Sequence, residues 1–250
     1  MPYDRGRILE FYQQDDVESM VDKHLLSAEI DLIRRRIPPN SLVLDAGCGE
    51  GEGTLVYAQV PGVIVHAADF SGTRLKKAAQ RLAGRSNVLL KKIDFLEKNP
   101  LDQDYDVIVS QRFLINITDW SLQQQVLKVL VAHLKPQGKL LVSEGCRNEA
   151  DALNGVRSLW GLKPIPDRWN NLFFDNDSLL GFMESLGCRL VEEDGLGTYY
   201  FLTRGIRPIF EPDPDWKDDF NRMAATREVA DRIGFGARFA RLKLWVFSKT

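Results

Sequence analysis

The 250-residue sequence contains few of the residues that bind metals or form disulfides. Its three cysteines, Cys48, Cys146 and Cys188, include no CxxC pair, and its three histidines lie far apart without ligand-like spacing. An odd and sparse cysteine count fits a reducing compartment better than a disulfide-stapled secreted fold. We therefore expect neither a disulfide framework nor a His/Cys metal site.

Long apolar runs and an excess of charge of one sign are also missing. No apolar stretch approaches the roughly 18 residues of a membrane span, and the polar N-terminal segment does not resemble a signal peptide. The 33 Lys and Arg residues nearly balance the 35 Asp and Glu residues, which argues against a protein whose main task is to coat nucleic acid. With 44% hydrophobic and 27% charged residues, the composition predicts a globular, cytoplasmic protein.

Strand-like and helix-like segments alternate along most of the chain. Short apolar runs predict strands at residues 41–47, 63–68, 88–92, 105–110, 139–143, 189–192 and 242–248. Apolar spacing and capping residues predict helices at 54–59, 71–82, 121–134 and 178–186. Strands separated by helices indicate an α/β fold with a doubly wound, mostly parallel seven-stranded sheet.

We expect a single domain over residues 1–250, built around a cofactor-binding core at 38–145. Residues 1–37 precede the core as a helical cap, which ends at the Pro38-Pro39 pair. Residues 146–172 and 205–241 interrupt the alternation, and we interpret them as insertions on the substrate side. The first insertion leaves the carboxyl edge of the sheet, where open α/β sheets bind ligands.

The most informative segment is the glycine-rich turn after the first strand. Glycines at 47, 49, 51 and 53 let the chain turn tightly and bring backbone N–H groups close to a ligand. Asp69 ends the next strand, twenty residues after Gly49. At that spacing a carboxylate accepts hydrogen bonds from both hydroxyls of a ribose. The turn therefore predicts a ligand that contains a nucleoside.

The charges beside this turn indicate which nucleoside. Asp45 and Glu50 flank the turn, and no Lys or Arg occurs between residues 43 and 62. Like charges at ~4 Å repel by about 1 kcal/mol in water and by more in a drier site, so a pyrophosphate is disfavoured. S-adenosylmethionine has no phosphate and carries an ammonium and a sulfonium group. The acidic turn therefore favours S-adenosylmethionine over a dinucleotide.

Several segments resemble the motifs of the class I S-adenosylmethionine-dependent methyltransferases. Residues 42–51 resemble the first motif, residues 68–71 the second and residues 105–111 the fourth. The turn at 134–139 resembles the LKPGG turn, with Gln137 in place of its first glycine. The resemblance covers about residues 40–145 and implies S-adenosyl-L-methionine as cofactor and S-adenosyl-L-homocysteine as product. The cofactor contacts that it implies are Asp45, Gly47, Cys48, Gly49, Gly51, Asp69, Phe70, Asp94, Phe95 and Gln111.

The rest of the chain is similar to a narrower bacterial group of methyltransferases tied to surface-glycan or other small-molecule pathways. The similar segments include residues 114–120, 143–145, 169–175 and 198–204. That group more often has Trp-His-Asn where this chain has Trp169-Asn170-Asn171, so no histidine role is carried over. The likeness implies a small-molecule acceptor, and we expect methylation of a hydroxyl of a sugar or glycan intermediate.

Catalytic candidates lie at the carboxyl ends of the fourth and fifth strands or in the insertions. Methyl transfer from a sulfonium depends mainly on positioning and desolvation, so a general base is plausible but not obligatory. Glu144 ends the fifth strand and is the best placed carboxylate; an ion pair with Arg147 or Arg112 is its alternative role. Gln111 is expected to line the methyl pocket. Tyr199 offers a substrate-facing hydroxyl, unless it packs in the core.

Arginine, aromatic and amide side chains after strands four to six are candidates to bind the acceptor. If the arginines converge, they favour a carboxylate or phosphate through bidentate contacts; otherwise they are dispersed in solvent. The N-terminal segment can bring Tyr3, Arg7 or Tyr12 to the cofactor, as such segments do in related enzymes. The acceptor-binding candidates are Arg112, Arg147, Arg157, Trp169, Asn170, Tyr200 and Arg204.

Three other functions stay open at this point: N-methylation of a small-molecule amine, a nicotinamide-dependent oxidoreductase, and a non-catalytic nucleoside-binding module. The fourth strand is not followed by an Asn/Asp-Pro-Pro-aromatic sequence, which argues against methylation of the adenine amine. We expect a small-molecule acceptor, no nucleic-acid partner, no metal and no membrane span. The oligomeric state is open, and a homodimer is one option.

Overall fold

The computed structural model describes residues 3–14 and 20–250. The strands of its sheet are β1 (Leu42–Ala46), β2 (Ile64–Asp69), β3 (Val88–Lys92), β4 (Tyr105–Gln111), β5 (Leu134–Gly145), β6 (Cys188–Gly195) and β7 (Leu242–Lys249). The helices of the first half are α1 (Arg5–Gln13), α2 (Lys23–Arg34), α3 (Glu52–Tyr57), α4 (Gly72–Arg81), the 3-10 turn η1 (Leu114–Asn116) and α5 (Trp120–Ala132). Those of the second half are α6 (Arg147–Leu159), α7 (Asn176–Ser185), α8 (Gly197–Tyr200), the π-helical turn η2 (Phe201–Ile206), α9 (Arg207–Phe210), α10 (Asp219–Ala224) and α11 (Arg227–Ile233).

The sheet has seven strands in the order β3-β2-β1-β4-β5-β7-β6. Strand β7 pairs antiparallel with both β5 and β6, whereas the pairs from β3 to β5 are parallel. The chain thus winds outward from β1 in both directions, and the predicted doubly wound, mostly parallel sheet is confirmed. Because β7 is reversed, its first residue lies at the same edge as the carboxyl ends of β1, β4 and β5.

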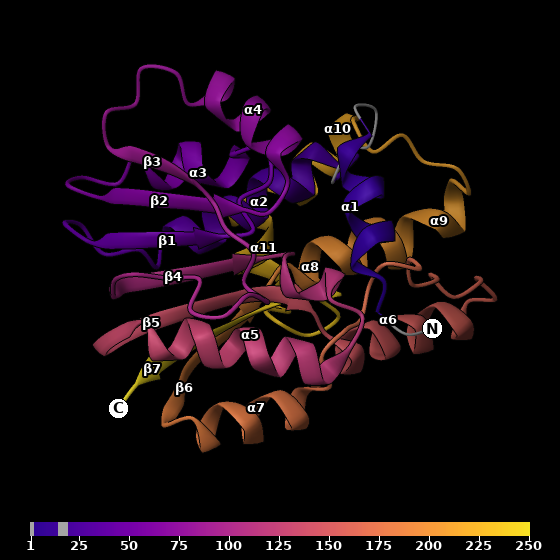
Figure 1. The fold of residues 1–250 in the computed structure, drawn as a ribbon. Coiled ribbons are helices and arrows are strands. Elements are labelled where there is room, and N and C mark those ends of the chain that lie inside the picture. The colour runs from indigo at the N-terminus through magenta and orange to yellow at the C-terminus, as the bar shows by residue number, and fades with distance from the viewer. Residues whose placement is uncertain (1–2, 15–19) are drawn as a thin grey trace.

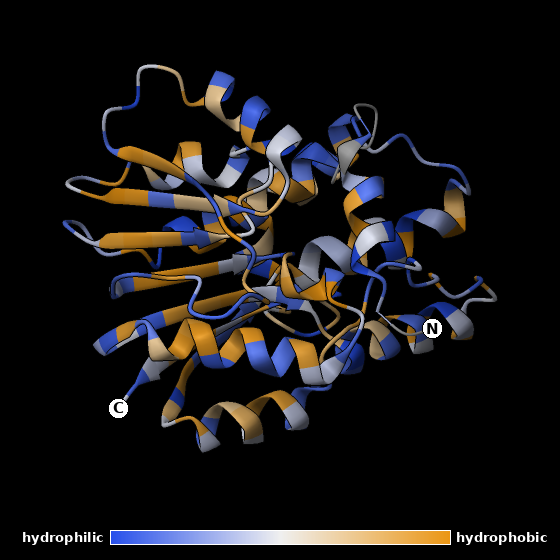
Figure 2. Ribbon diagram, viewed as in Figure 1, coloured by the Kyte–Doolittle hydropathy of each residue, from blue (hydrophilic) through white to orange (hydrophobic). Residues whose placement is uncertain are grey.

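The two faces of the sheet are covered by different helices because neighbouring residues of a strand point to opposite sides. Leu44 and Ile108 pack with α5 and α7 on one face, and Val43 and Val107 pack with α2 and α3 on the other. Figure 1 shows these two layers on either side of the sheet. Figure 2 shows that most of the central strands are hydrophobic, as strands covered on both faces require.

The described parts of the N-terminal segment form two helices rather than one. The side chain of Asp4 caps α1 and the side chain of Asp22 caps α2, as short acidic side chains at helix N-termini do. Residues 15–19 of the predicted helical cap lie outside the described residues. In Figure 1, α1 lies beyond the carboxyl ends of the central strands.

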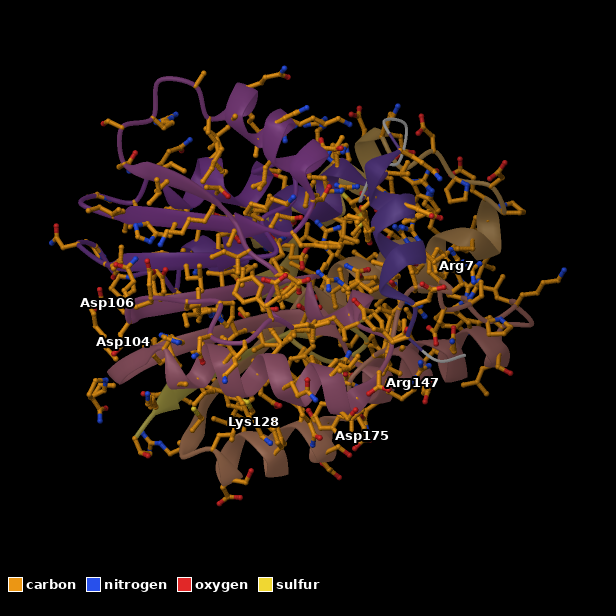
Figure 3. All side chains as sticks on the ribbon, in the orientation of Figure 1. Arg7, Asp104, Asp106, Lys128, Arg147 and Asp175 are labelled. Atoms are coloured by element: carbon orange, nitrogen blue, oxygen red, sulfur yellow. The ribbon has the colours of Figure 1, made fainter. Side chains whose placement is uncertain are left out.

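The two stretches that broke the alternation each contain helices. The first holds α6 and then a loop that leads to α7, and the second holds α9, α10 and α11. They contribute to a third apolar cluster that includes Leu153, Tyr199 and Phe239 and is separate from the two faces of the sheet. Figure 3 shows Arg7 and Arg147 at this end of the molecule and Asp104 and Asp106 at the opposite end of the sheet.

Candidate active site

The glycine turn joins β1 to α3 and is shaped by backbone conformations that favour glycine. Gly47 and Gly49 have φ of 74° and 55°, in the left-handed region that residues with a Cβ rarely adopt. A Cβ at Gly47 would lie 2.4 Å from the Cβ of Phe113, which follows β4. The turn therefore packs against the β4 loop at a distance that only glycine permits.

Asp69 connects this turn to the end of β2. Its Oδ2 accepts a hydrogen bond from the backbone N–H of Gly49 at 3.0 Å, and its Oδ1 accepts one from Ser71 at 2.8 Å. Burial raises the pKa of the Asp69 carboxyl, while these two backbone donors oppose the rise. The side chain lines a cavity, so a carboxylate with fixed orientation is presented where the sequence predicts a ribose.

Asp45 lies deeper, at the end of β1. The hydroxyl of Thr54 donates a hydrogen bond to its Oδ2 at 2.5 Å. Burial raises the pKa of Asp45 to about 6, with a smaller contribution from the charge of Asp69. This carboxyl therefore titrates close to neutral pH unless a cation is bound beside it.

The charge around the turn is less negative than the local sequence suggests. Arg74, Lys77 and Arg81 of α4 place their cationic groups 3.7, 3.4 and 3.9 Å from the carboxylate of Glu50. The prediction of an acidic turn without cations is thus wrong for Glu50, because a helix that follows the next strand supplies them. Asp45 and Asp69 remain as the buried acids of the site.

These groups surround a cavity of about 340 Å³ at the carboxyl edge of the sheet. Its walls on the β1–β3 side include Gly47, Cys48, Gly49, Asp69 and Phe70 and, after β3, Asp94 and Phe95. Asp94 forms an ion pair with Arg5 of α1. The predicted cofactor residues therefore line one cavity, with the exception of Gly51, which lies outside its wall and begins α3 with a φ of 77°.

Gln111 ends β4, the strand between β1 and β5, and lines the cavity. Its Oε1 accepts a hydrogen bond from the hydroxyl of Tyr57 at 2.9 Å. Its buried Nε2 has no acceptor among the described residues. An unmatched buried donor is costly, so this amide is available to a ligand that fills the cavity.

Beyond Gln111 the cavity continues over β5 and β7. Its wall there includes Arg112, Tyr200, Arg204 and Arg241, together with Phe173. Arg112 adopts a φ of 51° and pairs through its Nε with Glu29 at 3.1 Å. Burial raises the pKa of Tyr200, so its hydroxyl keeps its proton. Of the predicted acceptor residues, Arg112, Tyr200 and Arg204 line this half.

Glu144 is not placed to act as a general base. Its side chain is fully buried and does not line the cavity. Its Oε1 accepts hydrogen bonds from the hydroxyl of Ser110 and the N–H groups of Phe113 and Leu114, and its Oε2 accepts one from Ile115. Burial raises its pKa to about 7 in spite of these donors. The predicted catalytic role and the alternative ion pair are both wrong, because the β4 loop folds over this carboxyl.

Tyr199 is also structural. Its hydroxyl donates to the carboxylate of Asp22 at 2.8 Å and accepts a hydrogen bond from Asn221 at 2.9 Å. The ring is buried in the third apolar cluster and does not line the cavity. The alternative of a packed core aromatic is therefore the one that the structure supports.

Four predicted acceptor residues do not reach the cavity wall. Arg147 pairs with Asp167, and Arg157 donates to the backbone carbonyls of Lys163 and Arg204. The guanidinium of Arg7 lies over the indole of Trp169, which also meets the ring of Phe11 edge to face. Asn170 is buried and donates to the hydroxyl of Tyr12 at 3.2 Å. These side chains hold the loop and α1 in place. Of the two alternatives for the arginines, convergence on the cavity therefore does not hold for Arg147 and Arg157. The residues concerned are Arg147, Arg157, Trp169 and Asn170.

Other wall residues have no motif that could have identified them. Of the three N-terminal residues expected near the cofactor, Tyr3 and Tyr12 line the cavity, whereas Arg7 does not. Arg168 and Arg241 were not candidates, and they lie on the α6–α7 loop and just before β7. Their distance in the chain from the glycine turn hides their proximity in space.

Two features of the described residues limit the chemistry. No group of three or more His, Cys, Asp or Glu side chains in them is arranged to hold a metal ion. None of the described helices combines the length and apolar character needed to cross a membrane.

Comparisons with known proteins agree with this arrangement. Residues 44–140 match a family model described as a methyltransferase domain. The chain is 29% identical over 185 residues to the ubiquinone/menaquinone biosynthesis C-methyltransferase UbiE of Vibrio campbellii. This alignment covers 67% of this chain and 70% of that protein. The chain is 32% identical over 116 residues to phosphoethanolamine N-methyltransferase 1 of Arabidopsis thaliana, covering 46% of this chain but only 23% of the relative.

A solved structure shares the fold across almost the whole length. Magnesium protoporphyrin IX methyltransferase (ChlM) from Synechocystis PCC 6803 with bound SAH superimposes with a TM-score of 0.59 at 15% identity, covering 98% of this chain and 94% of that one. At this identity the likeness concerns the fold. The family match shows a methyltransferase domain at residues 44–140, and the glycine turn and Asp69 lie within it.

Proposed function

We propose that the protein transfers the methyl group of S-adenosylmethionine to an oxygen of a small-molecule acceptor, with a hydroxyl of a sugar or glycan intermediate as the expected target. The observation that carries the proposal is one cavity that contains the glycine turn and Asp69 on one side and Tyr200, Arg204 and Arg241 on the other. Gln111 lies between the two halves, at the end of the central strand β4.

The residues present fit the cofactor. The backbone of the glycine turn would hold its amino-acid part, Asp69 would accept hydrogen bonds from the ribose, and Phe95 would pack beside the adenine. The unmatched Nε2 of Gln111 would donate to a ligand at the centre of the cavity. When bound, the cofactor supplies an electrophilic methyl group on a good leaving group.

The chain's own contribution is then positioning and exclusion of water. Aromatic and aliphatic side chains such as Phe113, Ile115 and Phe173 line the path between the two halves. The neighbouring guanidinium groups repel a protonated amine, which supports an oxygen acceptor over an ammonium-bearing one. N-methylation is the second candidate, because the Arabidopsis relative is named an N-methyltransferase.

The test combines cofactor binding with product analysis. Calorimetry should show binding of S-adenosylhomocysteine and no comparable binding of NADH; the reverse result would refute the proposal. The protein is then incubated with methyl-labelled S-adenosylmethionine and a panel of sugars, hydroxy acids and amines. Mass spectrometry and NMR of the product should locate the label on oxygen, whereas a label on nitrogen would establish the second candidate.

A further inference from the structure

The half of the cavity beyond Gln111 is dominated by guanidinium groups. Arg112, Arg168, Arg204 and Arg241 all line it. They come from the end of β4, the α6–α7 loop, η2 and the residue before β7. Four elements that are distant in the chain therefore direct cationic side chains to one region.

Three of these arginines are held by acids that do not line the cavity. Asp22 pairs with Arg204 at 2.5 Å, and Asp167 pairs with Arg241 at 3.2 Å. Glu29 pairs with Arg112 in the same way. The three arginines line the cavity, whereas the three acids lie outside its wall, so positive charge is presented to the cavity.

Arg241 is fixed further by the backbone. Its Nη atoms donate to the carbonyls of Ile165 and Pro166 at 3.3 and 3.4 Å, and its guanidinium lies over the ring of Phe173. Its side chain is only 11% exposed. A buried and oriented guanidinium of this kind loses little entropy when it binds a ligand.

Arg168 completes the group at the mouth. Its side chain is exposed and forms no ion pair with residues in the described ranges 3–14 and 20–250. Four guanidinium groups against three carboxylates leave one excess positive charge around this half. Any bound sulfonium adds to that charge, so the region favours an anion.

We propose that the methyl acceptor carries an oxyanion, a carboxylate or a phosphate monoester, which Arg168 and Arg241 bind while the apolar wall around Phe173 holds the rest of the molecule. This inference rests on the proposed function and narrows its acceptor class. Arginine matches the geometry of both oxyanions through paired N–H donors. The bound anion would lie with the arginines, which leaves a neutral oxygen of the same molecule free to face Gln111.

The test measures binding of matched sugars to protein saturated with S-adenosylhomocysteine. The probes are glucuronate, glucose 6-phosphate, glucose and glucosamine, followed by calorimetry or by saturation-transfer NMR. At least one of the two anionic sugars should bind about tenfold or more tightly than glucose, and glucosamine should bind most weakly. Whichever of the two anionic sugars binds more tightly shows whether the acceptor carries a carboxylate or a phosphate.

Two variants distinguish the effect of a local contact on anion binding from the effect of the protein's overall charge. Arg168→Glu should lower the affinity for the more tightly bound anionic sugar by about tenfold or more. This is the loss expected when a charged hydrogen bond is replaced by repulsion. Arg222→Glu makes the same charge change on α10, outside the cavity wall, and should leave the affinity unchanged. The side chain of Arg168 is exposed and forms no hydrogen bond or ion pair with the part of the chain that the structure describes, so its replacement should not disturb folding.

The outcomes also separate this inference from the proposed function. If S-adenosylhomocysteine does not bind, the proposed methyl transfer fails. If S-adenosylhomocysteine binds but glucose or glucosamine binds as tightly as the anionic sugars, the proposal of an oxyanion site is wrong. The same holds if none of the four probes binds. Neither result changes the methyltransferase assignment. Equal losses in Arg168→Glu and Arg222→Glu would also overturn the oxyanion site.

Discussion

Replacement of Glu144 by glutamine tests whether this buried carboxyl titrates in the folded protein. Burial raises its pKa to about 7 from an ordinary value of 4.5. The folded chain therefore holds the proton more tightly than the unfolded chain does. The resulting stabilisation is fully present below about pH 4.5 and is lost as the pH rises through about 7. The difference corresponds to on the order of 3 kcal/mol in the free energy of unfolding.

In Glu144→Gln the side chain at position 144 is neutral at every pH. The variant therefore does not lose stability as the pH rises through 7. At low pH it should be similar to the wild type, because an amide and a protonated carboxyl are both neutral, and each keeps a carbonyl oxygen that accepts hydrogen bonds from the backbone N–H groups around it. Between pH 4 and pH 8 its free energy of unfolding relative to the wild type should rise by on the order of 3 kcal/mol.

Urea unfolding at a series of pH values, followed by tryptophan fluorescence, measures this difference. Glu184→Gln, at an exposed position of α7, is the matched control and should show no such change. A flat difference between Glu144→Gln and the wild type from pH 4 to pH 8 would refute the reasoning. It would mean that the four donors, rather than burial, set the ionisation of Glu144.

Three further predictions concern the acids and the tyrosine of the site. Asp69→Asn should weaken S-adenosylhomocysteine binding about 10- to 100-fold in calorimetry, since a charged hydrogen-bond acceptor is lost; the exposed Asp213→Asn should not. Binding should tighten between pH 5 and pH 7 as Asp45, with a pKa of about 6, ionises beside the ligand's ammonium group, and Asp45→Asn should reduce this dependence. Tyr199→Phe should lower the free energy of unfolding by about 1–3 kcal/mol in urea, because two buried hydrogen bonds are lost. It should leave the methylation rate within about twofold, and a folded variant without activity would restore Tyr199 as a catalytic candidate.

The sheet and the cofactor side of the cavity could be predicted because their signals are local. Short apolar runs bounded by turn residues predict buried strands from the local sequence alone, and Gly49 and Asp69 follow two successive strands of one strand-helix-strand unit. The position of the Glu144 side chain could not be predicted in the same way. A carboxyl at the end of a strand faces either solvent or the next loop, and here the choice depends on residues 113–115, some thirty positions earlier in the chain.

The residues that line the acceptor half of the cavity were harder to predict, because their positions also depend on contacts between distant segments. Arg147 and Arg241 lie almost one hundred residues apart and both contact Asp167. Only Arg241 turns its guanidinium to the cavity. Which arginine does so depends on how the α6–α7 loop packs, and no spacing within the chain encodes that. A prediction based on proximity to strand ends therefore named the general region correctly but chose Arg147 in place of Arg241.

The corrected position of Glu144 explains how a residue outside the cavity can still determine its shape. The carboxyl holds the backbone of residues 113–115, and Phe113 packs so closely on the glycine turn that a Cβ at Gly47 would lie 2.4 Å from it. The cofactor turn on β1, the loop on β4 and the end of β5 therefore form one packed unit. If Glu144 is shortened to alanine, the three backbone donors lose their acceptor, Phe113 is released, and the turn loses the surface against which it is shaped. Loss of cofactor affinity in Glu144→Ala would then reflect positioning, and it should accompany a loss of stability rather than occur alone.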